Sequence, residues 1–140
     1  MMRVVASTLL CLAVAACTSA PKGPQMTLGD LTAKGARKLS GTEVRTLLSG
    51  SRMSGESWAS GVRFTSMMAQ DGTFEGTTAR GRTFSGLWTV NEDGQSCTTF
   101  RYDPLGAGSP CVFTYELDGR YYIADRDEPT SRVVERRFTR

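Results

Sequence analysis

The chain has 140 residues, of which 39% are hydrophobic and 22% charged, and its formal net charge is +3. This length suits one small domain better than two, and such a weak charge gives no reason to expect nucleic acid as a partner. The chain contains no histidine, which excludes Ser-His and Cys-His catalysis and His-ligated metal sites.

The first 16 residues have the features of an export signal. Arg3 precedes an apolar run from Val4 to Ala16. Because a membrane-spanning helix needs roughly 20 apolar residues, this shorter run predicts a signal peptide, residues 1–16, that is removed. Its removal takes away Arg3 and changes the formal net charge from +3 to +2.

The segment Val14-Ala15-Ala16-Cys17 resembles the lipobox of bacterial lipoprotein precursors, in which an aliphatic and two small residues precede a cysteine. The resemblance implies that Cys17 carries a diacylglycerol, becomes the N-terminus, is acylated again with a fatty acid such as palmitate, and anchors the protein in a membrane. Thr18 in place of Asp implies the outer membrane, facing the periplasm. The alternative is secretion into the periplasm, since Ala13-Val14-Ala15 also fits a general signal-peptidase site.

A flexible tether is expected next, followed by a short helix. Residues 17–38 contain few bulky apolar side chains, which predicts a lipidated tether, and residues 39–140 are expected to form a single β-rich domain. Ser40 and Glu43 have the spacing of a capping box. An apolar stripe follows, so a helix over residues 41–49 is predicted to dock on the domain.

After Gly50 the sequence predicts a meander of about eight antiparallel strands. Asp-Gly pairs such as Asp71-Gly72 and Asp118-Gly119 are typical of the hairpin turns between them. The fold class is therefore mainly β, a short N-terminal helix and a small closed or nearly closed barrel, with an open sheet covered by the helix as the alternative. The charged last strand, residues 132–138, is expected at an edge. The predicted strands are 52–58, 62–69, 73–79, 83–90, 95–102, 111–117, 120–125 and 132–138.

A weak internal repeat supports this meander. The segment Gly72-Thr73-Phe74-Glu75-Gly76 is echoed ten residues later by Arg82-Thr83-Phe84-Ser85-Gly86. Phe74 and Phe84 are therefore expected at matching places on neighbouring strands.

Cys97 and Cys111 remain after processing, and an even pair in an exported chain predicts a disulfide. This bond would close a loop of about 15 residues and stabilise the domain by about 3 kcal/mol in the chain-entropy model. If the two cysteines lie opposite each other, the chain reverses within residues 103–110.

The remaining polar residues favour no catalytic site, metal or cofactor. The segment Asp125-Arg126-Asp127-Glu128 lacks the spacing of a calcium-binding loop, so a solvated loop is expected. A glycosidase needs two paired carboxyl groups, but the available carboxylates lie mostly beside turns. We therefore expect no enzyme, with a carboxylate-based peptidoglycan enzyme as a distant alternative. The carboxylates are Glu75, Glu116, Asp118, Asp125, Asp127 and Glu128.

Candidate contact residues lie near the C-terminus. Tyr121 and Tyr122 are adjacent in a predicted strand, so one ring must point outward. Arg132, Arg136 and Arg137 form the densest run of arginines, and guanidinium groups bind carboxylates and phosphates. An envelope protein, peptidoglycan or lipopolysaccharide phosphate is therefore a conceivable partner.

A helix, then a glycine-punctuated meander with Gly86-Leu87-Trp88, then a late disulfide resembles the layout of small, mostly uncharacterised envelope lipoproteins of Gram-negative bacteria. It is also similar to periplasmic protease-inhibitor barrels, although here the tether stands where the inhibitors carry their protease-plugging segment. We therefore expect a binding or envelope interaction module. The alternative is an inhibitor of an exported protease or other hydrolase.

Overall fold

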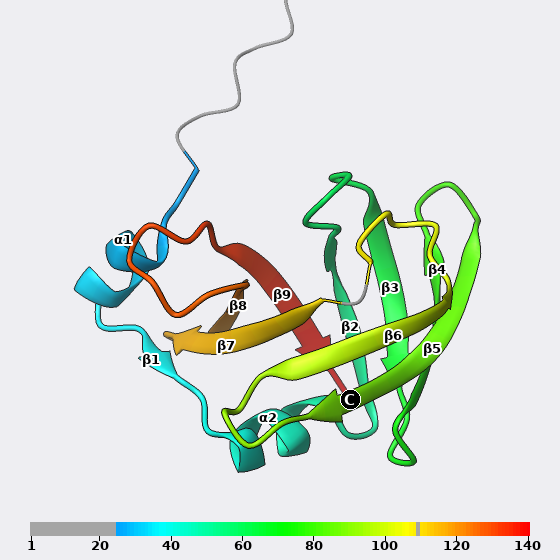
Figure 1. The fold of residues 1–140 in the computed structure, drawn as a ribbon, viewed down its shortest axis with the longest axis horizontal. Coiled ribbons are helices and arrows are strands. Elements are labelled where there is room, and N and C mark those ends of the chain that lie inside the picture. Colours follow the sequence, from blue (N-terminus) through cyan, green and yellow to red (C-terminus); the bar gives the residue numbers. More distant parts are fainter. Residues whose placement is uncertain (1–24, 109) are drawn as a thin grey trace, which may run out of the picture.

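The computed structural model describes residues 25–108 and 110–140. Eight consecutive antiparallel strands pair in chain order, and the last pairs with the first, so the predicted barrel is closed (Figure 1). A closed barrel leaves no exposed sheet edge between these strands. The strands are β2 (Ser51–Glu56), β3 (Arg63–Met68), β4 (Thr73–Thr78), β5 (Thr83–Val90), β6 (Ser96–Tyr102), β7 (Cys111–Leu117), β8 (Arg120–Ala124) and β9 (Val134–Thr139).

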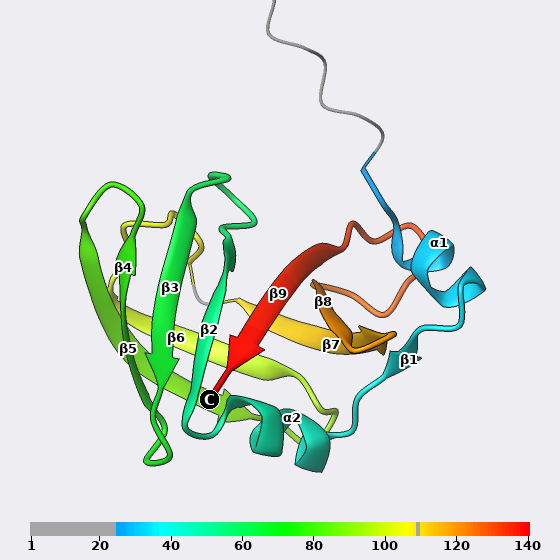
Figure 2. The same ribbon diagram turned by 180° about the vertical axis from the view of Figure 1, so that it is seen from behind.

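The closing strand β9 is not at an edge, contrary to the sequence-based expectation. It pairs with β2 through Arg52–Gly55 on one side and with β8 through Tyr121–Ile123 on the other. Figure 2 shows it crossing between these two strands. Its charged residues therefore alternate between the interior and the exterior of the barrel instead of protecting an edge.

The helix α2 (Gly41–Leu48) docks on the domain, as its apolar stripe predicted, and it lies at one end of the barrel. Its capping box is formed, because the Ser40 hydroxyl accepts from the Glu43 backbone N–H while the Glu43 carboxylate accepts from the Ser40 backbone N–H. Val44 and Leu48 are buried in the same cluster as the barrel interior. Hydrophobic contact with the barrel stabilises a helix that is too short to persist alone.

Residues 26–38, which precede α2, are folded, and this corrects the described part of the tether predicted for residues 17–38; the rest of that segment, residues 17–24, lies outside the described residues. The folded part forms the helix α1 (Leu28–Ala33) and a two-residue strand, β1 (Arg37–Lys38), which pairs with the part of β7 that β6 leaves uncovered. Leu28 and Leu31 are buried in one cluster with Tyr115 of β7 and Tyr122 of β8, and Figure 1 shows α1 beside these strands, outside the barrel. Within the described residues, packing therefore extends back to Met26, whereas the sequence-based prediction started the domain at Leu39.

The interior is filled by aromatic rings that lie over glycines of the neighbouring strand. Phe74 is paired with Gly86, and Phe84 with Gly76, which is the matching arrangement that the sequence repeat predicted. A Cβ atom on Gly86 would meet the Phe74 ring at 2.7 Å. Phe64 and Phe100 complete a cluster in which ring centroids lie 5.2 to 6.2 Å apart, within the range of favourable aromatic packing.

Candidate functional site

The interior of the barrel contains a cavity of about 280 Å³. It extends from Leu48 of α2 at one end of the barrel to Trp58 and Leu105 in the loops at the other end, which we call the mouth. Apolar side chains form most of its wall. A concave apolar site with a few polar groups is the usual form of a small-molecule pocket, and the volume of this one is just below the usual range for that class.

Arg136 is the charged side chain that is buried in this wall. It lies on β9 and is 5% exposed, and its guanidinium carbon is 5.2 Å from the centre of the Phe64 ring. Burial lowers the pKa of Arg136 to about 10, and the charge of Glu56 opposes this shift. The group therefore remains a cation at neutral pH.

Few polar groups of the protein accept hydrogen bonds from the Arg136 guanidinium. Its Nη1 donates to the Glu135 carbonyl oxygen at 3.0 Å, and within residues 25–108 and 110–140 no carboxylate lies within 4.0 Å of it. Buried charges in proteins are normally paired. A buried, unpaired arginine is therefore unusual in a wall that is mostly apolar.

A glycine makes room for this arginine. Gly55 of β2 is paired with Arg136 and also with Phe64. A Cβ atom at Gly55 would lie 2.7 Å from Nη1 and 2.9 Å from Cδ of Arg136. The missing side chain at position 55 thus lets the guanidinium lie inside the barrel, between β9 and β3.

The loop between β6 and β7, of which residues 103–108 and 110 are described, folds over the mouth. Leu105 is buried in the core cluster, and its carbonyl oxygen accepts from the Ser57 hydroxyl at 3.0 Å. Asp103 holds the loop by accepting from the backbone N–H groups of Leu105 at 3.1 Å and Gly108 at 2.7 Å. A protruding loop would have favoured an inhibitor, whereas Leu105 points inward.

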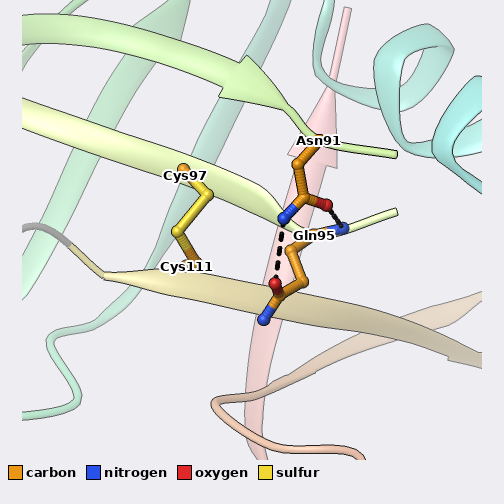
Figure 3. The surroundings of a disulfide bond; sticks show 4 residues. All are labelled: Asn91, Gln95, Cys97 and Cys111. Atoms are coloured by element: carbon orange, nitrogen blue, oxygen red, sulfur yellow. Dashed lines mark hydrogen bonds between the residues drawn. A yellow bond between two sulfur atoms is a disulfide. The ribbon is translucent and has the colours of Figure 1, made fainter. Parts of the chain in front are cut away.

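The disulfide Cys97–Cys111 joins β6 and β7 at the base of this loop, as predicted. The two residues are directly paired, with Cα atoms 4.0 Å apart. Figure 3 shows the bond beside the β5–β6 turn, where the Asn91 side chain accepts from the Gln95 backbone N–H and donates to the Gln95 side chain, each at 2.9 Å. The bond therefore braces the two strands, β6 and β7, that carry the loop over the mouth.

The candidate contact residues do not gather on one surface. Tyr122 is buried under α1, and Tyr121 is half-buried, with its ring 5.4 Å from that of Phe138. The expectation of an exposed tyrosine contact is therefore wrong for Tyr122.

The three arginines also lie apart. Arg137 is on the outer surface, 3.7 Å from a Glu135 oxygen, whereas Arg136 is inside the barrel. Arg132 is half-buried near the mouth, with its guanidinium 5.5 Å from the centre of the Trp58 ring. Arg136 is therefore not a contact on the outer surface, because alternation along β9 places it on the same side as Phe138.

The acidic loop after β8 is tied to the fold. Asp127 accepts from Lys38 at 2.9 Å and from the Tyr115 hydroxyl at 2.6 Å. These two hydrogen bonds lower the pKa of Asp127. Burial of the Tyr115 side chain, together with its hydrogen bond to Asp127, raises the pKa of Tyr115. In the described part of the chain, no three His, Cys, Asp or Glu side chains are grouped to hold a metal ion. This cluster therefore connects β1, β7 and the loop.

Cys17 lies outside the described residues. Among those that are described, no helix has the length and apolar character needed to cross a membrane. No protein-family model matches the chain, and no curated protein matches its sequence.

Proposed function

We propose that the protein is a lipid-anchored protein on the periplasmic side of the outer membrane, and that its barrel is a binding module for small apolar molecules. The observation that carries the binding function is the cavity of about 280 Å³ inside the barrel. Small eight-stranded barrels are just wide enough either to be filled by their own side chains or to hold one small ligand. Here the aromatic cluster fills part of the interior and leaves the region beside Arg136 and Trp88 for a ligand.

The lipobox-like segment ending in Cys17 supports the proposed membrane anchoring. The first described residues of the fold support an orientation of the barrel relative to the membrane. Leu28 and Gly29 donate backbone hydrogen bonds to Ser131 and Pro129 of the β8–β9 loop, at 2.7 and 2.8 Å. This loop is at the mouth end of the barrel (Figure 1). Residues 17–26 span at most about 35 Å when extended, so an anchor on Cys17 would keep the mouth close to the membrane surface.

The proposed lipid anchoring is tested by replacing Cys17. We expect Cys17→Ala to abolish incorporation of labelled palmitate, to change the mass of the processed protein and to release the protein from the outer-membrane fraction. If Cys17→Ala is processed to the same N-terminus as the wild type and remains equally membrane-associated, the lipoprotein proposal is wrong. Secretion into the periplasm would then replace it.

The binding function is tested with an uncharged apolar probe, N-phenyl-1-naphthylamine, whose fluorescence rises in apolar surroundings. We expect saturable binding by the full chain carrying Cys17→Ser, which lacks the acyl groups. Val112 lines the cavity, so Val112→Phe should fill space and weaken probe binding. Leu87→Phe is the matched control, because Leu87 is 50% exposed on the outer surface.

Two results would contradict the binding function. One is the absence of saturable probe binding to the folded wild-type barrel. The other is equal probe binding by Val112→Phe and the wild type when both variants unfold cooperatively.

A further inference from the structure

The buried cation in the cavity wall indicates the chemistry of the ligand. Arg136 has five N–H donors in one plane, and the protein groups described here accept from Nη1 alone. None of the described buried side-chain nitrogens is fully covered without a hydrogen-bond partner. The other guanidinium nitrogens of Arg136 therefore reach space that a water-sized group can enter.

The local arrangement holds the guanidinium in place from two sides. Phe64 faces it at 5.2 Å, and Gly55 leaves the space in which its Cδ and Nη1 lie. A guanidinium that stacks on an aromatic face still presents its edge to a partner. A carboxylate matches that edge because both groups are planar and form two parallel hydrogen bonds.

The surroundings restrict the rest of the ligand. Met68, Trp88 and Phe100 line the same cavity, so a second charge on the ligand would be placed against apolar walls at a high cost. Asp125 also lines the cavity, but it is exposed, and its carboxylate lies 3.7 Å from Arg126. Among the described residues that line the cavity, Arg136 is therefore the charged side chain that is buried.

We propose that the cavity binds an amphipathic monoanion, a compact hydrocarbon body with one carboxylate, and that Arg136 binds this carboxylate. This inference rests on the proposed binding function and adds the class of ligand. A medium-length fatty acid and another apolar carboxylic acid share this chemistry. Arg136 holds the charged end, and the rings and Met68 enclose the hydrocarbon.

The test compares octanoate with 1-octanol, which share a chain length and differ in the charged group. Trp58 and Trp88 are the two tryptophans of the chain and both line the cavity, so tryptophan fluorescence of the full chain carrying Cys17→Ser reports binding. A hydrogen bond to a charged group contributes about 1.5 to 3 kcal/mol, which corresponds to roughly 10- to 150-fold in affinity. We expect octanoate to bind at least about tenfold more tightly than 1-octanol.

The residue is tested with Arg136→Met, which keeps an unbranched apolar side chain in the cavity. It should remove the preference for octanoate and leave 1-octanol binding within a factor of about 2 or raise it, as expected when only a charge-assisted hydrogen bond is lost. Arg137→Met is the matched control on the outer face and should behave as the wild type. If Arg136→Met does not fold, the wild-type preference for octanoate and its loss in Gly55→Ala decide the question.

The outcomes separate the two proposals. If octanoate and 1-octanol bind the wild type equally, or if Arg136→Met keeps the preference, the carboxylate inference is wrong and the apolar binding function stands. If neither compound nor the uncharged naphthylamine probe binds, the proposed binding function is wrong, and the carboxylate inference that rests on it is wrong as well. An octanoate preference in the wild type that disappears in the variants supports both.

Discussion

Gly55 and Arg136 face each other on paired strands, and the arginine side chain occupies the space where a Cβ atom on Gly55 would lie. This relationship explains how a barrel of this size accommodates a guanidinium beside its aromatic cluster. It also makes the position of the cation sensitive to one methyl group on the neighbouring strand.

Gly55→Ala should displace the guanidinium and destabilise the fold. Added atoms in a packed interior typically cost about 1 to 3 kcal/mol, and here the Cβ would also lie 3.1 Å from the Glu135 carbonyl oxygen. Urea unfolding followed by tryptophan fluorescence measures the loss. Gly41→Ala is the control, since its Cβ would meet neighbours only at 3.5 Å or beyond, and it should cost nothing. Equal unfolding midpoints for both variants would contradict this account of Gly55.

The helix α1 should contribute to the stability of the whole domain. Leu31 is fully buried between α1 and the outer face of the barrel, and Leu→Ala in a packed core typically costs about 2 to 5 kcal/mol. We expect Leu31→Ala to lower the free energy of unfolding by an amount in this range, measured by urea denaturation. Lys34→Ala, an exposed change at the end of the same helix, should have little effect. A Leu31→Ala variant as stable as the wild type would mean that residues 26–38 behave as a tether.

The strands, α2 and the disulfide were predictable because each has a local signal. Alternating side chains, Asp-Gly turns and the Ser40–Glu43 capping box lie within a few residues of one another in the chain. The helix α1 also has a capping box, formed by Thr27 and Asp30. Two leucines in six residues are nevertheless too few to define a helical period, and the stability of α1 comes from docking on strands about 85 residues away.

The sequence contains a pattern that predicts the buried position of Arg136, but the high charge of its strand favoured a different interpretation. Val134, Arg136 and Phe138 alternate along β9 and therefore share one face. Phe138 indicates that this face is the interior. The density of charge suggested an edge strand, but pairing with β2 closes the barrel, and that long-range contact decides which residues are buried.

Loss of the disulfide should weaken the pairing between β6 and β7. Only two residue pairs, Ser96–Val112 and Cys97–Cys111, are in register between these strands. For a loop of about 15 residues, the Cys97→Ser/Cys111→Ser double variant should lose about 3 kcal/mol of stability. Hydrogen exchange should accelerate most at Cys97, Thr98 and the start of β7. Reduced wild-type protein should behave as the double variant does, and detection of free thiols in the native oxidised protein would contradict the bond.

The stability of the domain should fall in acid through the capping box of α2. Hydrogen bonds from Ser40 and the ion pair with Arg37, at 2.8 Å, lower the pKa of Glu43 from 4.5 to about 2. A carboxylate with a lowered pKa in the folded state stabilises the protein above its unfolded pKa. That contribution is lost as the pH falls from about 4.5 towards 2 and the group is protonated. Urea unfolding midpoints between pH 6 and pH 2 measure this dependence.

Glu43→Gln is the matched control for this titration. Its amide oxygen still accepts from the Ser40 backbone N–H, so the cap is retained, but the side chain has no charge to lose. The variant should be less stable than the wild type at pH 6, because the Arg37 ion pair is gone, and the difference should shrink as the pH approaches 2. A difference that stays constant across this range would show that Glu43 titrates alike in the folded and unfolded chains, and that its contacts with Ser40 and Arg37 do not favour the charged form.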